Sequence, residues 1–151
     1  MDLKPIKAPW RRFLSREDGQ ALVEAAIIIP VLLLLAFGVV MAGRVSHTKI
    51  AVQAAAREAS RALATAPSEQ EGMAAALDAA RSVAEGYGLS GDGLTVTVES
   101  NGFQRGGTAT AEVTYRVPLG DLPLMNRVEV TVSSSHWERI DLYRSREAVL
   151  R

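Results

Sequence analysis

The sequence of 151 residues contains no cysteine. A disulfide framework, a thiolate nucleophile and a cysteine-based metal site are therefore excluded. Histidine is nearly as scarce, since His47 and His136 are the only two, and neither has a second histidine three or four residues away. Because protein zinc sites are built from ligands at such spacings, we expect no metal and no cofactor.

The chain also lacks net charge and a catalytic pattern. Lys plus Arg and Asp plus Glu both number 17, whereas a nucleic-acid-binding protein would carry a clustered basic face, so we expect no nucleic acid partner. Asp92, Glu112 and Asp121 lack the register of a calcium loop, and no glycine-rich loop ends in Lys-Ser or Lys-Thr. Serines 133–135 have no base paired with them in the pattern. We expect a protein that is not an enzyme.

The chain does contain one long uncharged run. Residues 25–43 read AAIIIPVLLLLAFGVVMAG and carry no charged side chain. About 20 helical residues cross a hydrocarbon layer of ~30 Å. Because this run is apolar all round and shows no polar face, a transmembrane helix is favoured over a buried core helix. We expect that helix, in contact with the lipid bilayer, over residues 20–43.

Basic residues crowd the N-terminal flank of this run. Residues 1–19 hold five Lys or Arg against three Asp or Glu, a balance of +2. The positive-inside rule then predicts a cytoplasmic N-terminus and, after Arg44, a domain on the far side, which in a bacterium is the periplasm. A secretory signal cut near Ala42 and Gly43 is the minor alternative, since so long an apolar core is more typical of an anchor.

Single residues interrupt the apolar pattern of the segment. Pro30 removes the helical hydrogen bond to the carbonyl of Ala26, which predicts a kink or a loosening there. Gly38 and Gly43 are small positions where another helix could approach closely. Glu24 is a carboxylate near the cytoplasmic boundary, where it either reaches toward the headgroups or pairs with a cation inside an assembly.

The stretch that joins these residues resembles a known class of leader. In "SREDGQALVEAAIIIP" a glutamate follows a glycine by five positions, and an apolar helix begins at once. This resembles a class III prepilin signal of type IV pilins, with Gly19 before the cut, Gln20 as the new N-terminus and Glu24 as the fifth mature residue. The continuation through "VVMAGR" and "VQAAAREASRALA" resembles the TadE-like pseudopilin family of tight-adherence (Flp) pilus systems, over about residues 16–66.

The resemblance implies a structural role at the bacterial inner membrane. A prepilin peptidase would cut after Gly19, whose missing side chain suits an extended scissile segment. Glu24 would then neutralise the amino group of Gln20 on a neighbouring subunit and set the register between subunits. The implied partners are this peptidase, other pilins or a sister pseudopilin, and the inner-membrane assembly platform. Incorporation into the extracellular pilus and a role only in its initiation both stay open.

Packing between subunits in such an assembly would use the apolar positions of the segment, such as Ile27, Leu32 and Phe37. The sequence departs from the family pattern in two respects. Ala25 follows the glutamate where an aromatic residue often stands, and the cysteine pair that is frequent in the outer domain is absent. Packing alone must therefore hold the outer domain together.

Beyond the membrane the patterns predict an α+β domain. An alanine-rich stalk helix with an apolar stripe continues to Pro67, and the capping-box pattern from Ser68 to Glu71 then starts a second helix. That helix would present Met73, Leu77, Ala80 and Ala84 on its apolar face, and Gly86 or Gly88 would end it.

After the glycine-rich loop at residues 86–93 the pattern switches to period two. Runs at 94–100, 108–117 and 127–135 alternate apolar and polar residues and are separated by turn-forming links, which predicts an antiparallel three-stranded meander. One face of this sheet would pack against the second helix. The C-terminal stretch from His136 could extend the last strand, fold back onto the domain or meet a partner.

The expected fold class is thus α+β, with an N-terminal transmembrane helix that continues into a long helical stalk, then a second helix and a small antiparallel three-stranded sheet. The expected boundaries are a leader at 1–19, the transmembrane helix at 20–43, the stalk at 44–66, the second helix at 67–86, the meander at 87–139 and a tail at 140–151.

Two other functions compete with the pilin interpretation. One is an uncleaved single-pass membrane protein with a periplasmic binding or sensing domain, which predicts an intact leader and indifference to substitution of Gly19. The other is a membrane-anchored enzyme, which would need a pocket of perturbed titratable groups.

Overall fold

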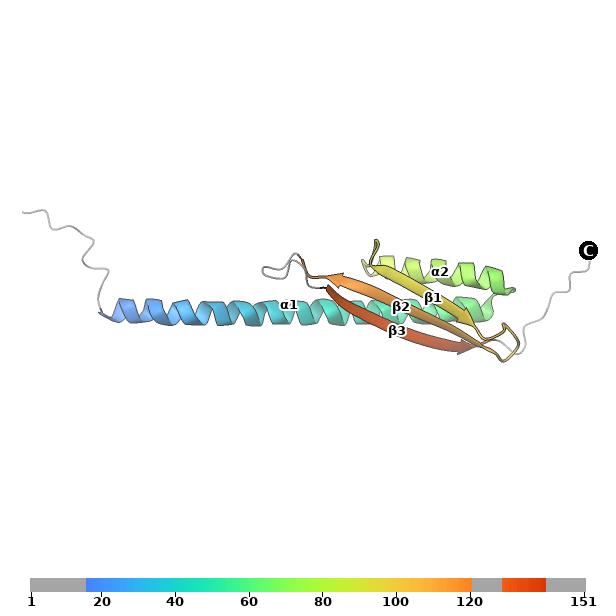
Figure 1. Ribbon diagram of the computed structural model, residues 1–151, viewed down its shortest axis with the longest axis horizontal. Helices are drawn as coiled ribbons and strands as arrows, with labels where there is room; N and C mark the ends of the chain where they lie inside the picture. The colour runs from blue at the N-terminus through green and yellow to red at the C-terminus, as the bar shows by residue number, and fades with distance from the viewer. Residues whose placement is uncertain (1–15, 121–128, 141–151) are drawn as a thin grey trace, which may run out of the picture. The chain divides into compact units, whose positions relative to one another are not determined.

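In a computed structural model, the chain is described over residues 16–120 and 129–140. The elements in chain order are two helices, α1 (Arg16–Thr65) and α2 (Glu69–Gly86), and three strands, β1 (Leu94–Ser100), β2 (Thr108–Pro118) and β3 (Glu129–Arg139) (Figure 1). The fold is α+β, as the sequence predicts. The chain divides into two units, residues 1–40 and residues 41–151, and each is described separately.

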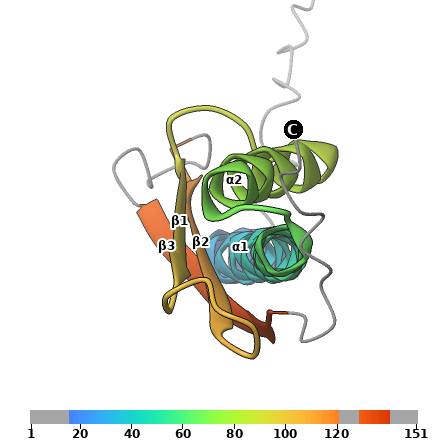
Figure 2. The ribbon, with the colours of Figure 1, turned by 90° about the vertical axis from the view of Figure 1, so that its right-hand side faces the viewer.

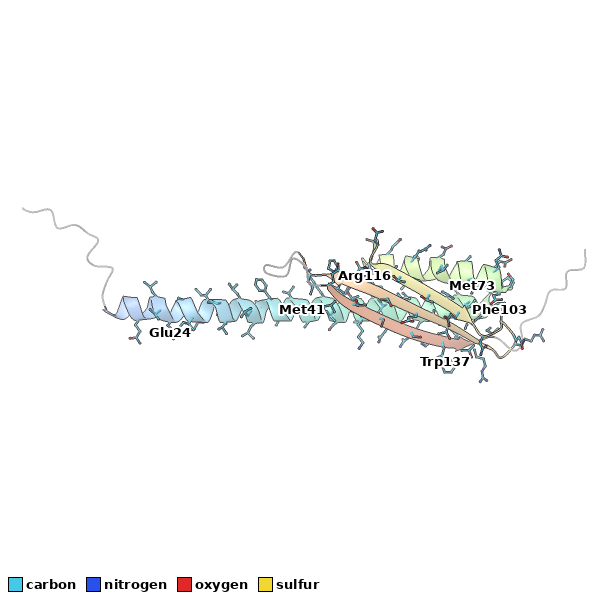
Figure 3. The ribbon with its side chains drawn as sticks, in the orientation of Figure 1. Glu24, Met41, Met73, Phe103, Arg116 and Trp137 are labelled. Carbon is cyan, nitrogen blue, oxygen red and sulfur yellow. The ribbon has the colours of Figure 1, made fainter. Side chains whose placement is uncertain are left out.

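The first unit consists, in its described part, of the beginning of α1. The helix runs through Pro30 without interruption, so the loosening predicted there does not break it. Its large apolar side chains point outward (Figure 3), and the exposed Leu, Ile and Val side chains between Leu22 and Val40 show 44% to 73% of their surface, whereas Phe37 is half-buried. A helix this apolar is long enough to cross a membrane by length and composition.

In the second unit, the outer part of α1 and the whole of α2 lie on the same side of the sheet (Figure 2). Alanine dominates the contact layer, because the fully buried residues include Ala55 and Ala59 on α1 and Ala76, Ala80 and Ala84 on α2. The small side chains let the helices and the sheet approach closely. The packing contacts of the core therefore come from closely spaced backbones more than from large side chains.

The two ends of α2 follow standard capping chemistry. At its start the amide of Glu71 donates to Ser68 Oγ over 3.3 Å, as the capping-box pattern predicts. At its end Gly88 has a φ of +77°, and the amide of Leu89 donates back to the carbonyl of Ala84 over 2.9 Å. This is a Schellman motif, so Gly88 ends the helix and Gly86 is still inside it.

The sheet is the predicted antiparallel meander, in the order β1-β2-β3. In the central strand β2, Ala109, Ala111, Val113 and Val117 are buried. The register places Val113 opposite Val96 on β1. At the far end of β1, Ser100 Oγ donates to a carboxylate oxygen of Glu69, which ties the sheet to the first turn of α2.

Two expected features differ from the structure in detail. The fully buried line on α2 begins at Gly72 and proceeds in steps of four residues, while Met73 and Leu77 are only half-buried at its edge. Four-residue steps put the smallest residues of α2 on one buried face, and at Gly72 that face meets Leu63 of α1.

The last strand is also longer than its alternating pattern predicts. β3 continues to Arg139 and includes His136 and Trp137, so the first residues of the C-terminal stretch extend the strand. Ile140 follows with only 1% of its surface exposed. The expected strand residues 127–128, the leader up to residue 15 and the tail beyond residue 140 lie outside the described residues.

Candidate assembly segment and membrane-proximal pocket

The residues predicted to carry processing and subunit register lie in the first turns of α1. Gly19 is half-buried, whereas Gln20 and Glu24 are exposed, and Figure 3 shows Glu24 pointing away from the helix. A side chain at Gly19 would meet nothing within 4 Å, so this glycine is not required by packing within the described chain.

The backbone at the predicted cut is helical and not extended. Gly19 and Gln20 both belong to α1, which begins at Arg16. A peptidase that needs an extended segment would have to unwind this first turn, and first turns open most readily because their leading amides lack helical partners. The expectation of an extended scissile segment therefore applies to a bound state, since the free chain is helical there.

The spacing of Gln20 and Glu24 gives them a shared helix face. Four residues correspond to slightly more than one turn and to an axial rise of ~6 Å. After a cut between Gly19 and Gln20, the new amino group would lie at the helix terminus and within about one turn of the Glu24 carboxylate. That carboxylate can thus serve a cation of its own chain or of a neighbour.

The small residues of the predicted packing surface are open in the structure. A side chain at Gly38 or at Gly43 would meet nothing within 4 Å. Phe37 is half-buried and Pro30 is exposed. The two glycines thus have open space beside them inside the described chain, which is what close approach of another helix requires.

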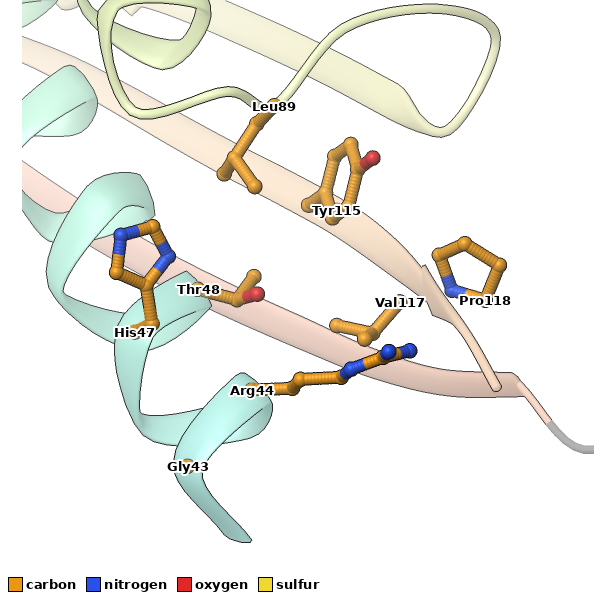
Figure 4. Close-up of a pocket in the computed structure, with 8 residues that line it drawn as sticks. All are labelled: Gly43, Arg44, His47, Thr48, Leu89, Tyr115, Val117 and Pro118. Atoms are coloured by element: carbon orange, nitrogen blue, oxygen red, sulfur yellow. The ribbon is translucent and has the colours of Figure 1, made fainter. Parts of the chain in front are cut away.

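A pocket of about 340 Å³ lies in the second unit, where α1 faces the loop after α2 and the end of β2. Its described lining is shown in Figure 4 and comprises Gly43, Arg44, His47, Thr48, Leu89, Tyr115, Val117 and Pro118. In the sequence His47 stands out only as one of two histidines, and the rest of this pocket was not predicted. The steps of three and four residues from Arg44 to His47 and Thr48 were the available signal.

The loop between α2 and β1 contributes Leu89 to this pocket, because Gly88 lets the chain turn back. Gly88 adopts the left-handed conformation, and it returns the chain so that Leu89 is buried. Gly93 accepts a hydrogen bond from the amide of Arg116 over 3.0 Å, which fixes the loop against β2. On α1 the ring of His47 makes an edge contact with the ring of Tyr87, with 5.9 Å between centroids.

Chemical groups outside this pocket are dispersed. Within residues 16–120 and 129–140, no three His, Cys, Asp or Glu side chains gather in a way that would hold a metal ion. Asp92 and Glu112 are both exposed, on the loop before β1 and on β2, and Asp121 lies outside the described residues. Serines 133–135 and His136 are consecutive in β3.

Comparison with known proteins agrees with the geometry of α1. A family model described as TadE-like protein matches residues 19–61. The match begins at Gly19, includes Glu24 and the apolar run, and extends into the buried stripe of α1. No curated protein and no solved structure matches the chain. The chain thus carries a TadE-like domain at residues 19–61.

Proposed function

We propose that this chain is a minor pilin or pseudopilin of a tight-adherence pilus, cut by a prepilin peptidase after Gly19. The TadE-like domain relates the chain to that pilus system. The finer role, in assembly or in initiation of the pilus, is structural and not enzymatic. Its partners are the peptidase, other pilins or a sister pseudopilin, and the inner-membrane assembly platform.

The observation that carries the proposal is that the apolar part of α1 begins directly after Gly19. From Leu22 to Val40 the large side chains are outward-facing hydrocarbon, and Glu24 is the only charged group from residue 19 to residue 43. A carboxylate in such a segment costs roughly 2.5–3.5 kcal/mol at the membrane centre and less near an interface. Its cost is offset where a cation pairs with it, and cleavage creates such a cation at Gln20.

The topology follows from charge and length. The basic leader at 1–19 stays in the cytoplasm, the apolar segment crosses the inner membrane once, and the second unit is periplasmic. Removal of the leader leaves a subunit whose N-terminus begins with the membrane helix. Such a subunit can leave the bilayer and enter a helical assembly, because contacts with neighbouring helices then replace the contacts of its apolar surface with lipid.

The experiment that tests the proposal is the mass of the full chain extracted from membranes, with and without a co-expressed prepilin peptidase. We expect a new N-terminus at Gln20 only when the peptidase is active. Gly19→Val should block the cut, and the matched Gly38→Val should not, since both glycines have open space around them. An intact leader in the presence of a peptidase that processes another substrate would refute the proposal.

A second candidate is an uncleaved single-pass protein with a periplasmic binding or sensing domain. The pocket around Arg44 and His47 favours it, because a binding domain needs a concave site with a few polar groups. The same mass measurement separates the two functions. A chain that keeps its leader and is indifferent to Gly19→Val would be this receptor-like protein.

A further inference from the structure

The proposed role in pilus assembly does not explain the polar groups that line the pocket in the second unit. Arg44 supplies a permanent positive charge, and Thr48 and Tyr115 supply hydroxyl groups, while Leu89 and Val117 give an apolar wall. The eight described lining residues include no carboxylate. Figure 4 shows the Arg44 side chain extending from α1 toward Val117 and Pro118, across the pocket from Leu89.

The pocket begins where the uncharged run ends. Gly43 is the last residue of the run from 25 to 43, and Arg44 is the first charged residue after Glu24. Nineteen helical residues rise ~28 Å, which is close to the ~30 Å hydrocarbon thickness of a bilayer. When this segment spans a membrane, Arg44 and its pocket therefore lie at the depth of the lipid headgroups, where Arg and Tyr side chains commonly anchor.

The chemistry of the lining matches one class of ligand at that depth. A guanidinium binds phosphate oxygens in a bidentate way, and hydroxyl groups add donors. The apolar wall suits the glycerol backbone and the first methylenes of a lipid. Among the described lining residues Arg44 carries a positive charge and none is a carboxylate, which favours a net negative headgroup over a zwitterionic one. The volume of about 340 Å³ is near the lower end of ligand pockets, which suits a headgroup and not a whole lipid.

We propose that this pocket binds the headgroup of an anionic phospholipid from the leaflet at which α1 leaves the membrane, with Arg44 bound to its phosphate. Arg44 also interacts with another group in the chain. A guanidinium carries five N–H donors, so the lipid needs only part of them. The bound lipid fixes the depth of the second unit at the membrane surface. This inference rests on the membrane insertion included in the proposed function, but it does not depend on cleavage at Gly19.

The test uses the full chain in lipid nanodiscs of phosphatidylcholine with and without phosphatidylglycerol. After release into mild detergent, native mass spectrometry counts the phosphatidylglycerol molecules that stay bound. We expect Arg44→Gln to lower their retention about tenfold, the loss that corresponds to a charged hydrogen-bonding partner. Arg57→Gln is the matched control, because Arg57 is exposed on the same helix and does not line the pocket.

A second variant keeps the test decisive if Arg44→Gln does not fold. The double variant Thr48→Val and Tyr115→Phe removes two hydroxyl groups while nearly preserving shape, and we expect it to weaken retention severalfold with unchanged thermal unfolding. Equal retention by Arg44→Gln and Arg57→Gln would overturn the proposal, as would equal retention of the two lipids. Displacement of the lipid by inorganic phosphate alone would show that the pocket holds a free anion.

Flotation of the wild-type chain with vesicles separates this inference from the proposed function. If the chain does not float, the membrane part of the proposed function fails, and the lipid site fails with it. If the chain floats but retains no phosphatidylglycerol, only the lipid site is refuted.

Discussion

Single glycines decide how closely the elements of the second unit approach, and Gly72 shows this most directly. A Cβ atom at Gly72 would lie 2.9 Å from the Cβ of Ala66 and 2.9 Å from Cδ1 of Leu63. The leucine side chain can rotate away, but the alanine Cβ is fixed to its backbone. Any side chain at this position therefore has to move the start of α2 away from the end of α1.

We predict that Gly72→Ala lowers the free energy of unfolding by ~1–3 kcal/mol, the usual cost of overpacking. Thermal or urea unfolding of the detergent-solubilised full chain measures it. Gly86→Ala is the matched control, since it lies in the same helix and its Cβ would meet nothing within 4 Å. It should be neutral or stabilising by up to ~1 kcal/mol, because alanine is the better helix former. Equal destabilisation by both changes would contradict the argument.

At the scale of elements, local sequence signals set where α2 begins and ends, and packing sets which face it buries. Ser68, Pro67 and Gly88 each have a local physical role that the sequence reveals, and the structure places all three at helix ends. The half-buried positions of Met73 and Leu77 could not be predicted in this way. Two stripes on α2 are apolar, and only tertiary packing selects the one with smaller side chains.

The N-cap of α2 gives a prediction at this scale. Replacing Ser68 with alanine removes the acceptor of the Glu71 amide, so Ser68→Ala should cost ~1 kcal/mol of stability. Hydrogen exchange should then speed up in the first turn of α2 and leave β2 unchanged. Ser133→Ala, an exposed serine on β3, serves as the comparison. An unchanged exchange rate at Glu71 would show that the hydroxyl does not cap the helix.

At the scale of the whole molecule, the chain combines a unit that buries its apolar core with a helix that leaves its apolar side chains exposed. Residues 41–151 bury a core of small side chains under a sheet, whereas α1 before residue 41 exposes almost all of its hydrocarbon. Such exposure is stable only in lipid or against other apolar helices. The exposed apolar side chains of the first unit therefore need lipid or other helices to cover them, because the described chain does not.

The role of Glu24 is tested at this scale. We predict that Glu24→Gln leaves membrane insertion intact, because a neutral side chain is easier to bury in hydrocarbon. Assembly should fail, since the amino group of Gln20 on the neighbour then lacks its counter-charge. Co-precipitation with pilus components and counts of surface pili measure this, with Glu58→Gln on the exposed face of α1 as control. Normal assembly of Glu24→Gln subunits would refute the ion-pair role.

The sequence by itself determined the element types, their order and the segment that is long and apolar enough to span a membrane. These depend on local or periodic properties, namely uniform hydrocarbon over residues 25–43, capping chemistry around α2 and alternation along the strands. The roles predicted for Gly19, Gln20 and Glu24 come from the resemblance to a family, and they stay predictions.

Only the tertiary structure decided which residues meet across the chain. Arg44 and Tyr115 are 71 positions apart by their numbering, and no periodicity relates them. Their meeting at one pocket depends on the turn at Gly88, the anchoring of Gly93 to β2 and the packing of small side chains between α1 and the sheet. Such contacts follow from the free energy of the whole packed unit, and local patterns do not specify them.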